Sequence, residues 1–174
     1  MNLVRATQSN KTRGMTLLEI LVVFAVVAIL AGVVISISDS FRKRAETAQC
    51  LSKMRTVHSG LSSYLIDQGH WPQLPPEAME FSETEYFTFW MKSIEPYGIS
   101  EENWLCPSDK INKEKFKKEK TGSYIPTAFD GFMITPHRWN QPWLVERGDL
   151  HGKGAHIAMP DGSINPSTKA FGGR

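Results

Sequence analysis

The first strong pattern along the chain is an uninterrupted run of apolar residues close to its start. Residues 15–37 contain only three polar side chains, those of Thr16, Glu19 and Ser36. A helix rises about 1.5 Å per residue, so this run reaches roughly 34 Å, enough to cross the ~30 Å hydrocarbon layer of a membrane. The pattern therefore predicts a transmembrane helix at 15–37.

A second pattern follows, in which apolar residues recur every three or four positions. They are Phe41, Ala45, Ala48, Leu51, Met54, Val57, Leu61 and Leu65. Such spacing forms the apolar stripe of an amphipathic helix. Because no Pro or Gly lies between Gly32 and Gly60, we expect the membrane helix to continue through 38–68 on the far side of the membrane. Gly69 should end it.

The remaining residues, 69–174, should form a globular domain that covers this stripe. Ser82 and Glu85 have the spacing of a capping box ahead of an apolar pattern, which predicts a short helix at 83–95. The Lys-rich stretch at 110–120 is expected to be a solvated loop, with a contact to anionic lipid as the alternative.

Beyond residue 123 the pattern changes to that of short strands separated by turn residues. The candidate strands are SYIPTAF, GFMIT, PWLVE, AHIAM and SIN. The pair Asp161-Gly162 favours a tight hairpin turn. A small antiparallel sheet on the C-terminal half of the long helix would bury the apolar faces of both, which gives an α+β fold.

Charge predicts how the chain is oriented in the membrane. The basic leader at 1–14 contains Arg5, Lys11 and Arg13 and no acid, so it should stay in the cytoplasm and the domain should lie outside. Without these three cations, the 20 basic residues fall to 17 against 18 acidic ones. A chain without a strong positive field is not expected to bind nucleic acid.

A secretory signal peptide, cut near Ser36-Ile37-Ser38, is the alternative for the N-terminal segment. Such signals have an apolar core of about 7–15 residues. The run of 23 residues at 15–37 is longer, which favours a permanent membrane helix.

Glu19 is the one carboxylate within the apolar run, and it needs a cation. An ionised acid in a membrane helix costs about 2.5–3.5 kcal/mol, and no Lys or Arg lies between Gly14 and Arg42. The partner must be a new positive charge or a group on another molecule. Cleavage after Gly14 would create such a charge, because Met15 would then begin the chain with a free amine.

These residues resemble a known family. The segment RGMTLLEILVVFAVVAILAGVV is similar to the N-terminus of type IV pilins and of type II secretion pseudopilins. The resemblance implies that a prepilin peptidase cuts after Gly14, that Met15 is N-methylated and that Glu19 guides subunit docking. YLIDQGHWP, at 64–72, resembles the signature that ends the first helix of major pseudopilins.

The C-terminal part resembles a narrower group of pilin-like proteins common in planctomycetes and verrucomicrobia. The matching elements are Cys50 in the first helix, CPSD at 106–109 and the late segment LHGKGAHIAMPDGSI. The resemblance implies a pilin-like fold, with a long N-terminal helix packed on a small sheet.

In function, the resemblance implies a structural subunit rather than an enzyme. It would be a single-pass protein of the bacterial inner membrane with a periplasmic domain, assembling into a type II secretion pseudopilus or a type IV pilus-like filament for protein secretion. Its expected partners are the prepilin peptidase, other pilin subunits through lateral helix packing, membrane lipid, and the assembly platform with its ATPase. A membrane-anchored carbohydrate-binding protein or hydrolase is the alternative.

Cys50 and Cys106 are the only cysteines, and the predicted orientation places both in an oxidising compartment. Two states stay open for them. One is a disulfide that closes a loop of about 57 residues, worth roughly 4 kcal/mol in the chain-entropy model. The other is a pair of separate buried thiols.

His151, His156 and Asp161 could be drawn as a metal or catalytic cluster, with His137 nearby in the sequence. Alternation along AHIAM sends successive side chains to opposite faces of a strand, so a convergent site is not implied. No CxxC or HExxH motif accompanies them. We expect Asp161-Gly162 to be a structural turn.

Two further features, a set of aspartates and a set of tryptophans, could bind a ligand. Major pseudopilins of type II secretion, the family that this chain resembles, often hold a calcium ion in a C-terminal loop, and Asp130, Asp149 and Asp161 could supply carboxylates. Their spacing matches no recognisable calcium motif, so no cofactor is firmly expected. Five Trp residues could form a carbohydrate platform, although in so small a domain packing is the expected role.

Overall fold

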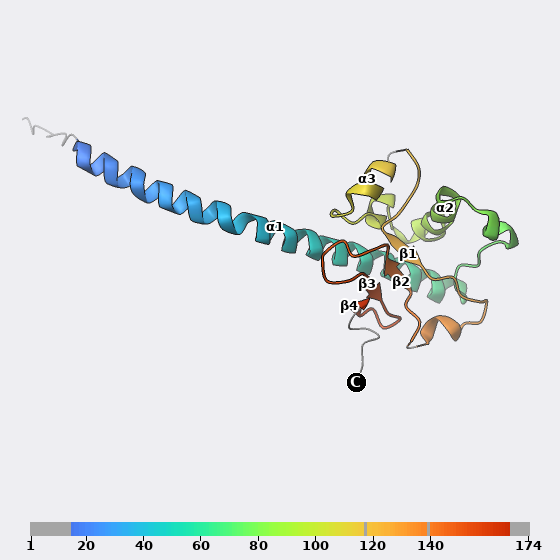
Figure 1. Cartoon of the computed structure of the whole chain (residues 1–174). Coiled ribbons are helices and arrows are strands. Elements are labelled where there is room, and N and C mark those ends of the chain that lie inside the picture. Colours follow the sequence, from blue (N-terminus) through green and yellow to red (C-terminus); the bar gives the residue numbers. More distant parts are fainter. Residues whose placement is uncertain (1–14, 117, 139, 168–174) are drawn as a thin grey trace, which may run out of the picture. The chain divides into compact units, whose positions relative to one another are not determined.

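The computed structural model describes residues 15–116, 118–138 and 140–167, and at residues 34–37 it describes the backbone alone. In this part of the chain a long helix is followed by two shorter helices, several 3-10 turns and a four-stranded sheet (Figure 1). The predicted α+β fold, with a long N-terminal helix and a small antiparallel sheet, is confirmed.

The long helix α1 spans Leu17–Gln68. It ends where the sequence predicts, because Gly69 adopts a φ of +72° and its N–H donates to the carbonyl of Leu65 at 3.0 Å. By length and composition, α1 is the one helix in the described residues that could cross a membrane.

The chain divides into two compact units, residues 1–41 and 42–174. In the first unit, every side chain that the structure describes is exposed, including those of Leu17, Phe24 and Ile29. A helix that is apolar on all sides is stable in a membrane or packed against other apolar surfaces. The exposed face of this segment is therefore suited to lipid or to other helices.

The second unit has its own core, which begins on α1 at Cys50. The inward stripe consists of Cys50, Met54, Val57, Leu61 and Leu65, each at most 2% exposed. The prediction that Phe41, Ala45 and Ala48 belong to this stripe was wrong, since all three are exposed. Apolar burial of α1 therefore begins only at Cys50, although the polar side chains of Glu46 and Thr47 already contact Ser108 and His151.

The second helix, α2, spans Glu83–Ile94 and begins with the predicted capping box. The Ser82 hydroxyl accepts from the N–H of Glu85, and the Glu85 carboxylate accepts from the N–H of Ser82. Phe87, Trp90, Met91 and Ile94 form its buried face. The 3-10 turns η1 (Pro76–Glu80) and η2 (Glu95–Tyr97) flank this helix.

Tryptophans dominate the space between α1, α2 and the sheet. Trp71, Trp90, Trp104 and Trp143 are each at most 1% exposed, and the Trp71 ring lies 4.9 Å from that of Trp143. These four are packing residues rather than an exposed carbohydrate platform. Trp139 lies outside the described residues.

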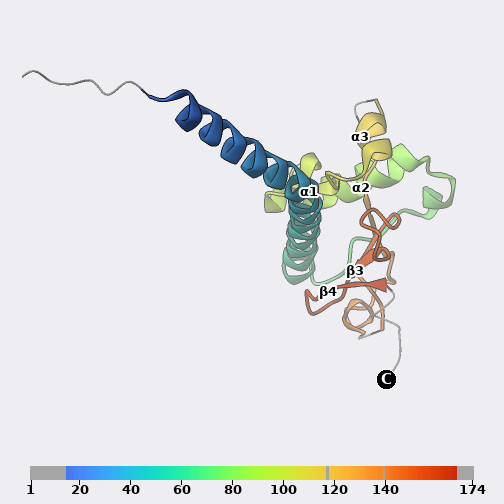
Figure 2. The same cartoon turned by 60° about the vertical axis from the view of Figure 1, so that its left-hand side comes forward.

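The sheet runs in the order β1-β2-β3-β4, all antiparallel. Its strands are Tyr124–Pro126, Leu144–Glu146, His156–Ala158 and Ile164–Pro166. They lie beside the C-terminal half of α1 (Figures 1 and 2). Each strand has only three residues, so the sheet depends on the helix behind it for stability.

Segment 131–135 was wrongly predicted to be a strand. Its backbone folds instead into turns that lead into the 3-10 helix η4, Thr135–His137. The Asp130 carboxylate accepts from the N–H of Phe132 at 3.0 Å, and the N–H of Thr135 donates to the carbonyl of Phe132. These local bonds satisfy the backbone groups that a strand would need for pairing.

The Lys-rich stretch was wrongly predicted to be all loop, because it contains the helix α3, Lys110–Phe116. Asp109 precedes this helix, and its carboxylate accepts from the N–H of Asn112 at 3.0 Å. This is the bond expected of a residue that caps a helix.

Candidate functional site

The start of α1 is organised by Thr16 and Glu19. The N–H of Glu19 donates to Thr16 Oγ1 at 3.3 Å, and the N–H of Thr16 donates to Glu19 Oε2 at 3.4 Å. This reciprocal pair is a capping box. Glu19 therefore has a local role, readable in the Thr-x-x-Glu spacing, beyond the docking role that the family resemblance implies.

The capping box does not neutralise the charge of Glu19. Among the described residues Glu19 forms no ion pair, and the nearest cation along the helix is Arg42. Met15, next to the helix start, is 67% exposed, and Gly14 lies outside the described residues. The carboxylate thus lies in an exposed apolar surface and remains available to a cation from elsewhere.

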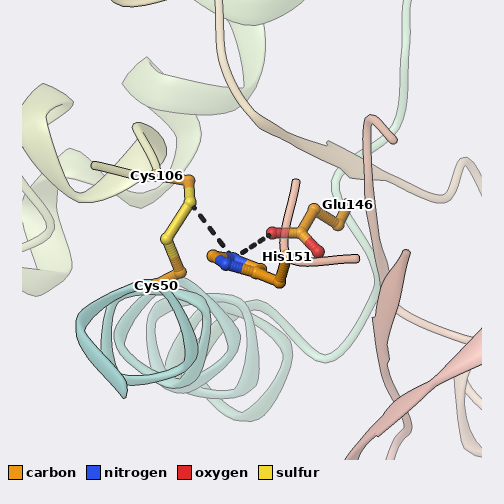
Figure 3. A group of neighbouring side chains, drawn as sticks. All are labelled: Cys50, Cys106, Glu146 and His151. Carbon is orange, nitrogen blue, oxygen red and sulfur yellow. Dashed lines mark hydrogen bonds and ion pairs between the residues drawn. A yellow bond between two sulfur atoms is a disulfide. The ribbon is translucent and has the colours of Figure 1, made fainter. Parts of the chain in front are cut away.

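In the second unit, a disulfide joins Cys50 of α1 to Cys106, in the loop after the 3-10 helix η3 (Glu101–Trp104) (Figure 3). The Tyr124 hydroxyl donates to the carbonyl of Cys50 at 2.9 Å. The N–H of Cys106 donates to Ser123 Oγ at 3.0 Å. Burial raises the pKa of Tyr124. The bridge thus ties α1 to the loop that leads into the sheet.

Asp109, the last residue of the CPSD element, holds the same loop together. Its side chain is buried, and Oδ2 accepts from Ser123 Oγ at 2.8 Å and from Asn112 Nδ2 at 2.6 Å. A buried carboxylate is costly unless it is hydrogen-bonded. These bonds therefore explain how the Asp109 side chain can be buried at this position.

Three buried side chains meet beside the disulfide. Glu146 Oε1 lies 3.2 Å from His151 Nε2, and Glu146 Oε2 lies 2.8 Å from His156 Nδ1. The N–H of His156 also donates to Oε2, at 3.0 Å. On the other side, His151 Nε2 lies 3.5 Å from Cys106 Sγ. Figure 3 shows the His151 imidazole between the disulfide and the Glu146 carboxylate.

Strand alternation did not imply a convergent site for His151, His156 and Asp161. The structure nevertheless brings the two histidines together at Glu146, which that reasoning overlooked, while Asp161 lies in a separate turn. Strand β2 pairs with β3 through Leu144 opposite Ala158 and Val145 opposite Ile157. Continuing this register brings Glu146 opposite His156, where side chains share a face. The signal in the sequence was an acid at an inward position of the apolar strand PWLVE.

The pair Asp161-Gly162 forms the turn between β3 and β4. Gly162 has a φ of +80°, and its N–H donates to the carbonyl of Met159 at 2.9 Å. Asp161 accepts from the N–H of Ser163, and hydrogen bonds from Ser163 lower the pKa of Asp161.

The three calcium candidates do not come together. Asp130 and Asp149, like Asp161, accept backbone N–H groups within their own turns. In the described residues, the one group of metal-ligand side chains with all ligand atoms close together is Cys50, Cys106, Glu146 and His151. His137 lies apart from this group, near Trp143.

Residues 9–35 match the family model of the prokaryotic N-terminal methylation motif. The chain is 28% identical over 106 residues to the fimbrial protein of Neisseria meningitidis serogroup A, covering 61% of this chain and 62% of that protein. It is 29% identical over 96 residues to type II secretion system core protein G of Escherichia coli K12, covering 48% and 65% respectively. The chain thus spans less than two thirds of the length of these relatives. No solved structure matches it.

Proposed function

We propose that this chain is a prepilin-like subunit of the type IV pilin and pseudopilin family, supported by its N-terminal methylation motif and its pilin and pseudopilin relatives, and that it assembles through α1 into a pseudopilus or pilus-like filament. The observation that carries the proposal is the position of Glu19. Its carboxylate lies in an exposed apolar helix and has no cation among the described residues.

Processing supplies the missing cation. The prepilin peptidase hydrolyses the peptide bond between Gly14 and Met15, which removes the basic leader and frees an amine on Met15. N-methylation keeps the positive charge of this amine. In the filament, the amine pairs with Glu19 of a neighbouring subunit, where low dielectric surroundings strengthen the attraction between the two charges.

The rest of the first unit supplies the packing surface. Its exposed apolar side chains exchange lipid for those of neighbouring helices as subunits leave the membrane. The basic leader keeps the N-terminus cytoplasmic, and the domain beyond residue 41 projects into the periplasm. The assembly platform and its ATPase provide the energy. Relatives named for fimbriae and for secretion support a filament of this general kind.

Two substitutions at Glu19 separate helix capping from charge pairing. Gln can replace Glu in a capping box, so Glu19→Gln keeps the helix start and removes the charge, whereas Glu19→Ala removes both. We expect both variants to insert into the membrane and neither to enter filaments, measured by immunoblotting of sheared filaments against membranes. Wild-type incorporation of Glu19→Gln would contradict the charge-pairing role.

Mass spectrometry of the membrane-extracted protein checks the processing step in the same samples. The expected chain begins with N-methylated Met15. A mature chain that still begins at Met1, or that begins at Asp39 after signal-peptide cleavage, would contradict the proposed function.

A further inference from the structure

We infer that the thiol form of this protein binds one zinc ion between Cys50, Cys106, Glu146 and His151, so that a disulfide and a metal ion are alternative cross-links at one position. All four ligand atoms lie within 4.8 Å of one another (Figure 3). Two thiolates, an imidazole and a carboxylate are ligand types that zinc takes in tetrahedral sites.

The distances between His151 Nε2 and its neighbouring ligand atoms already match those between the ligands of a tetrahedral zinc ion. Zinc binds sulfur at about 2.3 Å and nitrogen or oxygen at about 2.0 Å, so tetrahedral ligand atoms lie roughly 3.3–3.8 Å apart. His151 Nε2 lies 3.2 Å from Glu146 Oε1 and 3.5 Å from Cys106 Sγ. Two edges of the tetrahedron are therefore in place.

The edge that must lengthen is the one between the two sulfurs. A disulfide holds them about 2 Å apart, whereas zinc needs roughly 3.8 Å. Once the bond is reduced, rotation about the Cα–Cβ bonds of Cys50 and Cys106 can supply this change. Their Cα atoms lie 4.7 Å apart, so the thiols stay close to each other after reduction.

The hydrogen bonds around His151 leave Nε2 suited to a metal. Thr47 Oγ1 donates to the carbonyl of Lys43 at 2.9 Å, so it accepts from His151 Nδ1 at 3.1 Å. These partners assign a proton to Nδ1. Nε2 is then the ring nitrogen whose lone pair can face a metal ion, on the side of Glu146 and Cys106. Such an outer partner fixes the orientation of a metal-binding imidazole.

Glu146 is held in the same way. His156 donates to Oε2 from both Nδ1 and its backbone N–H, which leaves Oε1 directed at His151. The Glu146 side chain is 1% exposed, and two buried thiolates beside it would be costly without a cation. A divalent ion offsets this charge.

Two surface cavities lie next to the group. One, of about 530 Å³, is lined by residues that include Thr47 and His151. The other, of about 440 Å³, is lined by residues that include Cys106 and Lys53. These cavities bring solvent next to His151 and Cys106, two of the four proposed ligands.

The two forms interconvert by a balanced exchange with a dithiol. The dithiol transfers two electrons and two protons to the disulfide and becomes a disulfide itself, which leaves two thiols on the protein. Zinc binding then releases the two thiol protons, because both sulfurs bind the ion as thiolates. Reoxidation by a protein disulfide removes two electrons, restores the bridge and releases the ion.

Metal titration of the full chain in detergent tests the inference. The protein is reduced with a phosphine, freed of reductant without oxygen and titrated with Zn²⁺, or with Co²⁺ as a coloured probe. We expect one ion per chain and the d–d bands of tetrahedral Co²⁺ with thiolate ligands. The oxidised chain should bind no ion at this position.

His151→Ala removes a ligand and should weaken zinc binding by the reduced chain at least tenfold, because even the loss of an outer partner of a ligand typically costs about that much. His137→Ala, at a histidine outside the group, is the matched control and should bind like the wild type. Equal affinity of the His151→Ala variant would overturn the inference. So would a wild type that binds no more zinc than the Cys50→Ser/Cys106→Ser variant.

X-ray absorption spectroscopy of the zinc-loaded wild type tests the ligand set directly, and its result does not depend on whether a variant folds. We expect two sulfur neighbours at about 2.3 Å and two nitrogen or oxygen neighbours at about 2.0 Å. A shell of four sulfurs would mean that the ion bridges two chains, and a shell without sulfur would place it elsewhere. Either result would overturn the inference.

Discussion

Gly122 lies so close to the ring of Phe87 that a larger residue cannot enter without displacing it. A Cβ at Gly122 would lie 2.5 Å from Phe87 Cε1, and the Phe87 side chain is itself buried. We expect Gly122→Ala to lower the free energy of unfolding by about 1–3 kcal/mol, measured by thermal denaturation in detergent. At Gly148 nothing lies within 4 Å of a built Cβ, so an equal loss in Gly148→Ala would contradict this explanation.

His58 predicts a pH dependence at the level of one residue. Its ring stacks on Trp143 with centroids 4.5 Å apart, and burial lowers the pKa of the imidazole. The unfolded chain therefore binds a proton more readily than the folded one. The stability that neutral His58 contributes is complete above its ordinary pKa of about 6.5 and is lost as the pH falls below that value.

Replacing His58 should flatten this response. We expect His58→Gln to lose less stability than the wild type between about pH 7 and pH 5, measured by urea denaturation at each pH. His137→Gln serves as the control because His137 is exposed. Identical pH slopes for His58→Gln and the wild type would contradict the prediction.

At the scale of elements, the capping box of α2 can be tested directly. Ser82→Ala removes the acceptor for the N–H of Glu85 and should cost about 1 kcal/mol, seen as a lower denaturation midpoint. Ser93→Ala, in the same helix, removes only a side-chain bond to the carbonyl of Phe89 and should change stability by less than about 0.5 kcal/mol. A smaller effect at Ser82 than at Ser93 would count against the role of the cap.

Elements with a local cause were predictable from the sequence. The end of α1 follows from Gly69, and the start of α2 follows from the Ser82 to Glu85 spacing. Helix α3 was missed because its lysines resemble a solvated loop and its stability depends on Asp109. The strand predicted at 131–135 does not form, although its residues favour a strand. The carboxylate of Asp130 accepts from the N–H of Phe132 and stabilises a turn there instead.

The cluster beside the disulfide could not be predicted, because it depends on contacts between distant segments. Cys106 and His151 are 45 residues apart, and Thr47 and His151 are 104 apart. Glu146 joins them only through the register of β2 with β3. Strand alternation shows which residues share a face, but it does not show which strands pair.

At the scale of the whole molecule, the two units should be separable. Every residue of the core cluster lies at or beyond Cys50, while the described side chains of residues 15–33 are exposed and mostly apolar. We expect a chain that begins at Arg42 to be monomeric without detergent and to keep its disulfide. Gel filtration and mass spectrometry under non-reducing conditions measure both properties, and aggregation of this shorter chain would contradict the separation.

The bridge between Cys50 and Cys106 also determines how tension passes through a stretched subunit. A pull on α1 from the N-terminal side of Cys50 reaches the loop at Cys106 through covalent bonds, and it bypasses the chain between the two cysteines, which are 56 positions apart. If that segment were released, it would add roughly 190 Å of extended chain. While the bridge is closed, α2 and the buried tryptophans between these cysteines are shielded from such a pull. A filament of these subunits would therefore lengthen less under load than one held together by side-chain packing alone.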